Sequence, residues 1–534
     1  MPGARQQRII FWAAGIFLLA FLLRYTHLVA IQQNSPFFNV FPGDLGAYDK
    51  WASRIVEQGW LGNEVFYQDP LYPYFLAIIY KVLGRDFFTV YAVQAVLGAA
   101  TAVIVFLLGS RIFSKSVGII GGVLYGCYAP AIFFDGLLLK VSLATFLFCL
   151  AVYFLIKGTL KESGSGLIFA GLLLGLASLA RANFLLLMPV VVLLLLLNRQ
   201  PPLYRRLVMA LFFTVGTMLV LVPVAARNYA VSGDLVVTTS QAGQNFYIGH
   251  NKAANGTYVK LAFVRPDPLH EQEDFHKEAE RRLGRELVPA EVSRYWLGQG
   301  LDFIKKEPVT FLQLTGKKIV LFFNNYEIPD NHNFYFHKRY SSVLDNLPLT
   351  FGLLSPFIVL GLLGMFHERR TEPFFLAVIQ VVYIGSVILF YVFSRYRMPV
   401  LPLLCLSAGY GITLFYNQFA GQRWGRFMFS LIISAAVFAV STYQVIKPFD
   451  FSHSYADEAI AYEIRGEEMQ ALASYQQALK IRPDYPRALE RAGKLQVKLK
   501  KYDEARQTYK RILKTNPQSV EAKYQIMWMD KKGL

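Results

Sequence analysis

The chain has 534 residues, of which 54% are hydrophobic and 17% charged, and it carries a formal net charge of +18. This composition, with repeated apolar runs long enough to cross a bilayer core of ~30 Å, excludes an ordinary water-soluble enzyme and predicts a polytopic membrane protein. The positive charge does not indicate a nucleic-acid partner, because Lys and Arg on one side of a membrane are its commoner source. The three cysteines lie far apart within apolar runs, which argues against a disulfide framework or a metal cluster.

Eleven apolar stretches are predicted to cross the membrane as helices, so the expected fold class is all-α. The first lacks the pattern of a cleavable signal peptide, and we expect it to remain as a signal anchor. The predicted spans are residues 9–31, 87–110, 117–134, 137–156, 166–181, 184–198, 207–225, 349–366, 373–394, 398–416 and 427–446.

The short connections between these spans predict the orientation of the chain. Every second connection is rich in Lys and Arg, as in "SRIFSK", "NRQPPLYRR" and "HERR". The positive-inside rule assigns these connections to the cytoplasm. With eleven spans, the N-terminus is then inside and the C-terminus outside, and three segments face outwards: residues 32–86, residues 226–348 and the tail from about 447.

Residues 166–198, "GLIFAGLLLGLASLARANFLLLMPVVVLLLLLN", allow two interpretations. One helix of this length would extend about 50 Å at 1.5 Å per residue, which is too long for one ordinary span. It would also invert every later loop and place "NRQPPLYRR" outside. We therefore predict a tight hairpin at "RAN", whose short arms leave Arg181 below the outer membrane surface.

The predicted outer loops have patterns of their own. In the first, "DKWASRIVEQGWLG" and "DPLYPYFLAIIYKVLG" are typical of amphipathic helices that lie along a membrane interface. The second loop, 226–348, is too long and too rich in aromatic residues to be only a linker. We predict that residues 1–446 form one membrane domain that includes both loops.

The tail, residues 447–534, contains an internal repeat. Ala471, Tyr475, Ala478 and Pro483 recur after 34 residues as Ala505, Tyr509, Ile512 and Pro517, and Ala492-Gly493 supplies a small pair early in the second unit. This resembles tetratricopeptide repeats, in which small residues allow paired helices to pack closely. Such modules bind peptides or proteins, so the tail is expected to bind a protein partner rather than to catalyse.

Charged residues stand at the predicted outer ends of the spans and in the adjoining loops. Arginines at outer ends oppose the positive-inside trend, and charges at membrane depth usually face a cavity or a partner. We expect these residues to converge on one outer face: Asp44, Asp69, Asp135, Lys140, Arg181, Arg227, Arg395 and Arg397.

An arginine-lined cavity at headgroup depth would suit a phosphate on a lipid. Arg pairs bidentately with phosphate oxygens and keeps its charge when partly desolvated, so the donor-phosphate candidates are Arg181, Arg227, Arg395 and Arg397. A carboxylate facing the same cavity could take a proton from an acceptor hydroxyl while the lipid phosphate leaves. This is glycosyl transfer from a polyprenyl-phosphate sugar, and it agrees with the lack of a Walker or Rossmann motif.

Each of these residues also has a structural interpretation. The four arginines could extend to outer lipid headgroups, and Asp44 and Asp69 could cap helices. Asp135 and Lys140 could pair with each other. The histidines show no metal-ligand spacing, and a divalent cation held by Asp44 and Asp69 is compatible with the sequence but not required by it.

The order of these motifs resembles the GT-C superfamily of integral membrane glycosyltransferases, and within it the protein O-mannosyltransferases and the lipid A aminoarabinose transferases. The resemblance is carried by "GDLGAYDKWA", then "DPLYPYFLAIIYKVLG", then "SLARAN" at the end of the fifth span. "RNYAVSGDLVVTTSQAGQNFYIGHN" and "SRYRMPVLP" resemble segments of bacterial members that carry C-terminal tetratricopeptide repeats. The likeness covers most of residues 10–410.

The resemblance implies roles for several residues. In that superfamily the acid of the first outer loop, commonly an Asp-Glu pair, is the catalytic base, and Asp44 matches the Asp. Leu45 stands where the Glu would be, which makes Asp69 a candidate second acid. Further candidates to line the cavity are Tyr48, Asp135, Lys140 and His250. The superfamily uses dolichyl- or undecaprenyl-phosphate sugars, acts on the outer face and usually inverts the anomeric carbon.

The resemblance also implies a place in the cell, the cytoplasmic membrane of a bacterium with the repeats in the periplasm. Two other classes of function remain open. An O-antigen ligase or polymerase-like transferase would use a lipid diphosphate donor. A transporter or a non-catalytic scaffold displaying the repeats is the second, although no interrupted helices recur in two halves as in inverted-repeat transporters. The sequence identifies neither the sugar nor whether the acceptor is a protein, a lipid or a glycan.

Overall fold

The computed structural model describes residues 4–40, 44–233, 236–265 and 270–534, apart from the side chains of residues 4, 5 and 44. Within these residues the chain consists of helices, without strands. It divides into two compact units. The first unit contains Met1–Val29, Gly43–Asp330 and Ser342–Ile446, and the second contains Ala30–Pro42, Asn331–Ser341 and Lys447–Leu534.

The long helices of the first unit coincide with the predicted spans. Short polar residues begin several of them, and Asp86, for example, caps α4 by accepting a hydrogen bond from the N–H of Thr89 at 2.8 Å. The helices are α1 (Ala4–Asn34), α4 (Phe87–Ile112), α5 (Lys115–Gly126), α6 (Ala129–Asp135), α7 (Val141–Lys161), α8 (Gly164–Ala180), α9 (Leu187–Leu197), α10 (Leu203–Ser232), α17 (Phe351–His367), α18 (Thr371–Ile388), α20 (Leu401–Ala420) and α21 (Trp424–Thr442).

These helices make the chain an integral membrane protein, but the predicted count of eleven spans is not confirmed. Among the described residues, seven helices are long and apolar enough to cross a membrane, or eight if α5 and α6 count as one span bent by 57°. α8, α9 with the turn before it, and α17 are apolar but shorter. The bend after α5 was not predicted, and Pro130 in the first turn of α6 accounts for it because proline lacks the N–H that a continuous helix needs.

Residues 166–198 form two helices, as the hairpin interpretation requires. The chain leaves α8 at Arg181, whose backbone is extended (φ −153°, ψ 111°), and continues through the short helix η1 (Ala182–Leu186) into α9. α8 packs closely on α10, because a Cβ on Gly171 would lie 2.1 Å from the carbonyl oxygen of Phe213.

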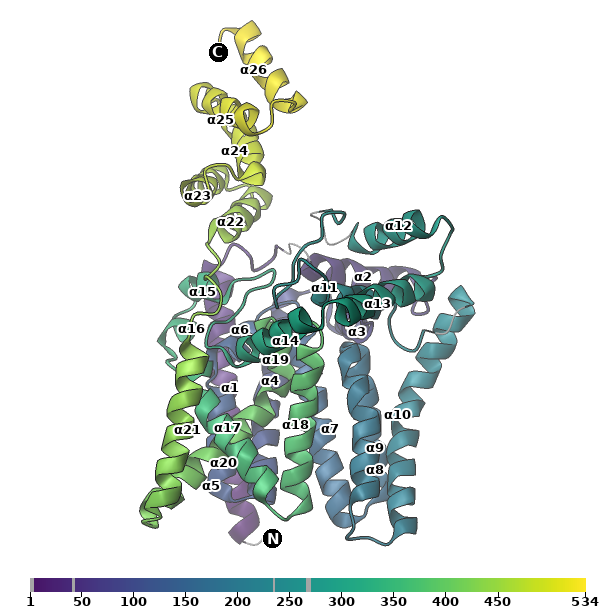
Figure 1. The fold of residues 1–534 in the computed structure, drawn as a ribbon. Helices are drawn as coiled ribbons and strands as arrows, with labels where there is room; N and C mark the ends of the chain where they lie inside the picture. Colours follow the sequence, from purple (N-terminus) through teal and green to yellow (C-terminus); the bar gives the residue numbers. More distant parts are fainter. Residues whose placement is uncertain (1–3, 41–43, 234–235, 266–269) are drawn as a thin grey trace. The chain divides into compact units, whose positions relative to one another are not determined.

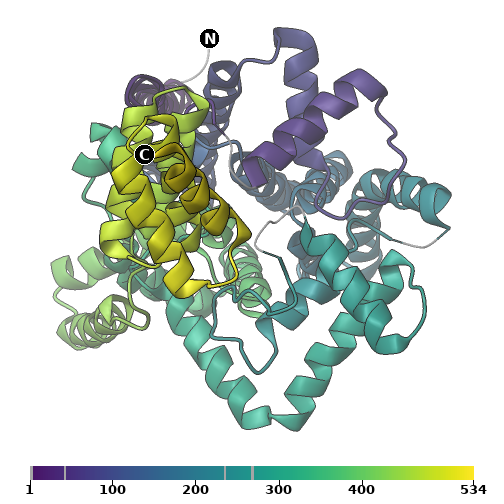
Figure 2. The ribbon, with the colours of Figure 1, turned by 90° about the horizontal axis from the view of Figure 1, so that it is seen from above.

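The connections with the Lys and Arg excess lie at one end of the first unit, beside the N-terminus, and the shorter helices gather at the opposite end, here called the loop end (Figure 1). Seen from above, the loop end has helices that run across the bundle (Figure 2). Its helices are α2 (Asp44–Gln58), α3 (Leu71–Leu83), α11 (Ala242–Gly249), α12 (Glu271–Leu283), α13 (Pro289–Lys306), α14 (Pro308–Phe323), α16 (Ser342–Asn346), α19 (Ser394–Arg397) and the turn η4 (Met398–Val400).

The second unit consists of the repeat helices and two short segments. Ala471, Tyr475, Ala505 and Tyr509 are each 0% exposed, as the repeat pattern predicts. The segments 30–42 and 331–341 share an apolar core with the first repeat helix. The helices of this unit are α15 (Phe334–His337), the turn η3 (Lys338–Tyr340), α22 (Ser452–Ile464), α23 (Glu468–Ile481), α24 (Pro486–Lys498), α25 (Tyr502–Thr515) and α26 (Val520–Lys532).

Candidate functional site

Asp69 joins three parts of the loop end. It precedes α3 and is 4% exposed. One carboxylate oxygen pairs with Nζ of Lys140, which stands at the start of α7, and the other accepts the backbone N–H of Ala182 at 3.0 Å. Two candidates that lie far apart in the sequence, Asp69 and Lys140, thus meet beside the break after α8.

Arg181 extends this cluster toward α19. Its Nη1 donates to the carbonyl oxygen of Arg395 at 3.2 Å, and its guanidinium carbon lies 4.3 Å from the ring centre of Tyr396. The side chain of Arg395 forms an ion pair with Asp330 at 2.5 Å. Arg181 is only 9% exposed, so protein groups rather than bulk water surround it. We call the following four residues the loop-end cluster: Asp69, Lys140, Arg181 and Arg395.

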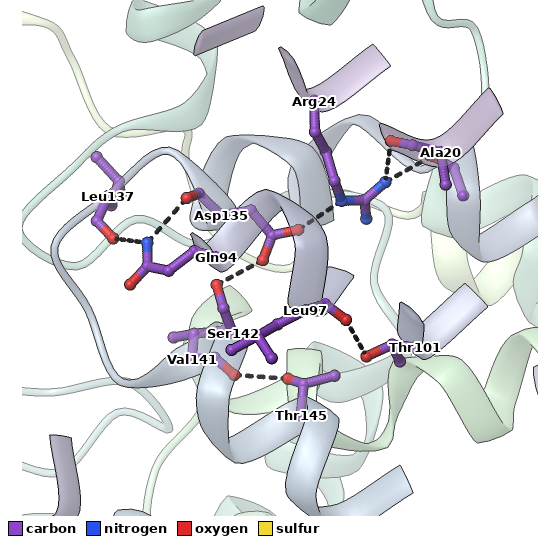
Figure 3. Close-up of polar contacts among 11 residues, drawn as sticks. Ala20, Arg24, Gln94, Leu97, Thr101, Asp135, Leu137, Val141, Ser142 and Thr145 are labelled. Carbon is purple, nitrogen blue, oxygen red and sulfur yellow. Dashed lines mark hydrogen bonds and ion pairs between the residues drawn. The ribbon is translucent and has the colours of Figure 1, made fainter. Parts of the chain in front are cut away.

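Asp135 does not pair with Lys140, which was one interpretation of the sequence. It pairs with Arg24 of α1, with Nε 2.7 Å from Oδ2, and its other oxygen accepts the hydroxyl of Ser142 (Figure 3). Arg24 also donates to the carbonyl oxygens of Ala20 and Gly126 at 3.1 and 3.0 Å. Asp135 is therefore saturated inside the helix bundle by groups that the sequence analysis did not single out.

The guanidinium groups of Arg227 and Arg397 are engaged by protein oxygens. Arg227 donates to the carbonyl oxygens of Leu61 and Glu64 at 2.6–2.8 Å and so fastens the loop between α2 and α3. Arg397, 3% exposed, pairs with Glu327 at 2.6 Å and donates to two carbonyl oxygens of residues 322 and 324. Both arginines thus hold loops to the bundle.

Asp44 is the first residue of α2, but its side chain, like residues 41–43, lies outside what the structure describes. Tyr48, one turn later, is 2% exposed and meets the ring of Tyr72 edge-on, with the ring centres 5.3 Å apart. The neighbouring Asp49 binds the hydroxyl of Tyr80 at 2.9 Å and Arg85 at 2.7 Å. These contacts fix α2 against α3. Because Asp44 is the first residue of α2, they also set the position of its backbone.

His250 belongs to a different buried place, beside Lys318 of α14. Its Nδ1 lies 3.0 Å from the carbonyl oxygen of Phe246, and its Nε2 lies 3.4 Å from Nζ of Lys318. Burial and the Lys318 charge lower the pKa of His250 to about 4. Burial also lowers the pKa of Lys318 to about 8. His250 is thus held as neutral imidazole, donating through Nδ1 and accepting at Nε2.

No group of three His, Cys, Asp or Glu side chains that could hold a metal ion occurs among the described residues. The carboxylate of Asp69 is shared between an ammonium and a backbone N–H. These two contacts give the carboxylate of Asp69 the positive charge and the hydrogen bond that a bound cation would otherwise replace.

Several residues of the site were missed from the sequence. Asp330 lies in a loop segment without a motif, and Tyr396 lies in α19, within the quoted "SRYRMPVLP". The sequence did not indicate that either residue would contact Arg395 or Arg181. Arg24 did have a signal, because a charge in the middle of an apolar span usually faces a partner. Its partner, Asp135, lies 111 residues further along the chain.

Comparison with known families confirms the resemblance seen in the sequence. Residues 68–226 match the family described as dolichyl-phosphate-mannose-protein mannosyltransferase, and residues 466–525 match the tetratricopeptide repeat family. The first match includes Asp69, Lys140 and Arg181. Residues 68–226 are thus similar to this mannosyltransferase family, and residues 466–525 are similar to tetratricopeptide repeats. No curated protein matches it in a search of whole sequences.

Several solved structures are similar to the chain, among them the following three. An oligosaccharyltransferase from Archaeoglobus fulgidus in the apo form has 13% identity and a TM-score of 0.46, over 84% of this chain and 58% of that one. The archaeal enzyme AglB from the same organism, in complex with an inhibitory peptide and a dolichol-phosphate, has 12% identity and a TM-score of 0.46, over 84% and 57%. ArnT from Cupriavidus metallidurans bound to undecaprenyl phosphate has 12% identity and a TM-score of 0.35, over 78% and 79%. The chain therefore spans less than two thirds of the length of the archaeal enzymes.

Proposed function

We propose that this protein transfers a sugar from a polyprenyl-phosphate donor to an acceptor hydroxyl on the extracytoplasmic side of a bacterial cytoplasmic membrane. The observation that carries the proposal is the loop-end cluster, in which three cations and one acid from four separate elements meet at one end of the bundle. The family match over residues 68–226 includes three of these four residues, and its name specifies a dolichyl-phosphate sugar as donor.

The donor phosphate is bound by the cations that keep some exposure. Lys140 has a side chain that is 16% exposed, and that of Arg395 is 17% exposed. Arg181, which is 9% exposed, contributes by holding the backbone of Arg395 through its bond to that carbonyl oxygen. Arg and Lys bind phosphate by charge-assisted hydrogen bonds. Arg227 and Arg397, whose guanidinium groups already have protein partners, hold the loops around the site.

Asp44 acts as the general base, and Asp69 orients Lys140. Removal of the acceptor proton by Asp44 and departure of the lipid phosphate occur in a single displacement, which inverts the anomeric carbon. The sugar and the class of acceptor are set by groups beyond the cluster.

The Lys- and Arg-rich connections support the proposed orientation. They lie at the end opposite to the loop end (Figure 1), which supports an outer position for the loop end and the cluster. The repeat family match supports recruitment of a protein, either the acceptor or a partner enzyme, by the second unit.

A transfer assay with purified protein in lipid vesicles tests the proposal. We expect transfer from a polyprenyl monophosphate sugar and none from the matching lipid diphosphate sugar. Asp44→Asn should lower kcat by about 10²- to 10⁴-fold, the usual contribution of a general base. Glu57→Gln, which changes an exposed acid in the last turn of the same helix, is the control and should leave kcat unchanged. Preferred use of the diphosphate donor, or normal turnover by Asp44→Asn, would contradict the proposal.

A further inference from the structure

Gln94, in the middle of α4, holds the turn that carries Lys140. Its side-chain Nε2 donates to the carbonyl oxygens of Asp135 and Leu137 at 2.9 and 2.8 Å (Figure 3). Asp135 is the last residue of α6, and the last carbonyls of a helix have no partner within it. Leu137 lies beyond Gly136, and its carbonyl oxygen also accepts the N–H of Leu139 at 2.8 Å. Gln94 is 0% exposed, so it supplies hydrogen bonds that water does not supply there.

The other end of the same amide is bound by Tyr72. The hydroxyl of Tyr72 donates to Oε1 of Gln94 at 2.7 Å, and Tyr72 is also 0% exposed. Tyr72 stands in the first turn of α3, three residues after Asp69. A chain of hydrogen bonds thus connects the segment that carries Asp69 to the turn that carries Lys140, and the amide of Gln94 is its centre.

The ion pair between Arg24 and Asp135 holds the same turn from the other side. Gly98, one helical turn after Gln94, lets α4 approach this pair. A Cβ at position 98 would lie 2.3 Å from both Arg24 Nε and Asp135 Oδ2. The backbone around Gly136 is therefore held through two carbonyls by Gln94 and through a carboxylate by Arg24. The side chain of Lys140, in contrast, bonds to Asp69 alone among the described residues.

We propose that Gln94, oriented by Tyr72, is a positioning residue that sets Lys140 against Asp69 so that the lysine receives the donor phosphate. This proposal rests on the proposed function. Lysine is a flexible side chain, so its ammonium is placed by the backbone from which it extends and by its acid partner. Fixing both in advance lowers the cost of ordering them when the donor binds. Gln94 touches no substrate and acts through Lys140.

The test compares two glutamines with the same burial. Gln94→Met keeps the shape and removes all three hydrogen bonds, and Tyr72→Phe removes only one. Gln380→Met is the control, because Gln380 is also 0% exposed but bonds only to α18 and α20, through the carbonyl of Leu376 at 3.0 Å and the hydroxyl of Ser407 at 2.7 Å.

The kinetic measurement is KM for the polyprenyl-phosphate sugar, with kcat measured at saturating donor. We expect KM to rise by at least about tenfold in Gln94→Met, which removes three hydrogen bonds, and by about threefold in Tyr72→Phe, which removes one. KM should be unchanged in Gln380→Met, and kcat should change less than KM in all three. The second measurement is hydrogen exchange of the amides of residues 136–140, which should be faster in Gln94→Met and unchanged in Gln380→Met.

The outcomes separate this proposal from the proposed function. Faster exchange in Gln94→Met with an unchanged KM, in an active enzyme, would overturn the positioning role alone. The same KM change in Gln380→Met would also overturn it, because it would show a general effect of destabilisation. If Gln94→Met does not fold, Tyr72→Phe decides by the same two measurements. A wild-type protein that neither transfers sugar nor binds a polyprenyl phosphate would overturn both proposals.

Discussion

Two polar clusters of the first unit use the same kinds of side chain and differ in their access to solvent. In the inner network, the side chains of Arg24 and Asp135 are 1% and 6% exposed, and their main polar atoms are bonded within the bundle. In the loop-end cluster, the side chains of Lys140 and Arg395 are 16% and 17% exposed, whereas Asp69 and Arg181 are buried. An ion pair that is closed off from solvent can only hold helices together. A partly exposed ion pair can exchange one partner for a ligand. The exposure of the pair, rather than its charge, separates the two roles.

The largest effect is expected when one member of the inner pair is removed. Asp135→Asn and Arg24→Gln each leave one charge buried without its partner, which costs about 3–5 kcal/mol in comparable cases. The double variant Arg24→Gln/Asp135→Asn removes both charges and should be more stable than either single variant. Thermal unfolding in detergent measures the order. A double variant that is less stable than both single variants would show that the charges themselves stabilise the bundle.

A smaller effect, on binding rather than on folding, is expected at the loop-end cluster. Lys140→Met removes a hydrogen bond from a charged group, and such bonds contribute about 1.5–3 kcal/mol, so donor affinity should fall by about ten- to a hundredfold. The unfolding temperature should change less than in Asp135→Asn, because the side chain of Lys140 is partly exposed to solvent.

Lys161→Met is the matched control for Lys140→Met, since Lys161 lies in the last turn of the same helix, at its other end. Its donor affinity should equal that of the wild type. Calorimetric titration with a polyprenyl phosphate compares the two variants. Equal losses in both would mean that the lysines act through the overall charge of the protein rather than through a site.

Among the described residues, Lys318 and His250 are buried together without an acidic partner. The pH dependence of folding stability therefore tests how burial alone changes the pKa of Lys318. Lys318 has a folded-state pKa of about 8, below its ordinary value of 10.5, because burial disfavours its charged form. Between these two values the unfolded chain binds more protons than the folded one, so stability should rise with pH, by about 1 kcal/mol from pH 8 to 9. Well below pH 8, the contribution of Lys318 to stability no longer changes with pH. Denaturant unfolding of the wild type and of Lys318→Met at both pH values measures the rise, which the variant should lack.

On the acid side, His250 should act in the same direction, over a lower pH range. Its folded-state pKa of about 4 lies below the ordinary value of 6.5, so the unfolded chain binds more protons between these values and stability should fall as the pH drops from 6.5 to 4. His250→Gln keeps a hydrogen-bonding side chain and should flatten this fall. A pH dependence that is the same in the wild type and in His250→Gln would contradict the burial of a neutral imidazole.

The sequence predicted the features that depend on local pattern. The apolar runs, the break at Arg181 and the 34-residue repeat all follow from side chains that are close together in the chain. Partnerships depend on tertiary contacts, and the pair of Lys140 with Asp69 joins residues 71 positions apart. Gln94 and Tyr72 could not be found, because a polar residue in an apolar run does not reveal which carbonyl or hydroxyl it will meet. The bend after α5 did have a local cause, Pro130, but the surrounding apolar run concealed it.

The smallest effect is expected from an ion pair at the opposite end of the bundle. Arg205 and Glu162 are 2.7 Å apart, the same distance as Arg24 and Asp135, but their side chains are 51% and 38% exposed. Water and salt screen such a pair, and both side chains lose conformational freedom when they form it. Glu162→Gln should therefore leave the unfolding temperature unchanged within error. A loss comparable to that of Asp135→Asn would mean that distance, and not burial, decides what an ion pair contributes here, and the distinction between the inner network and the loop-end cluster would fail.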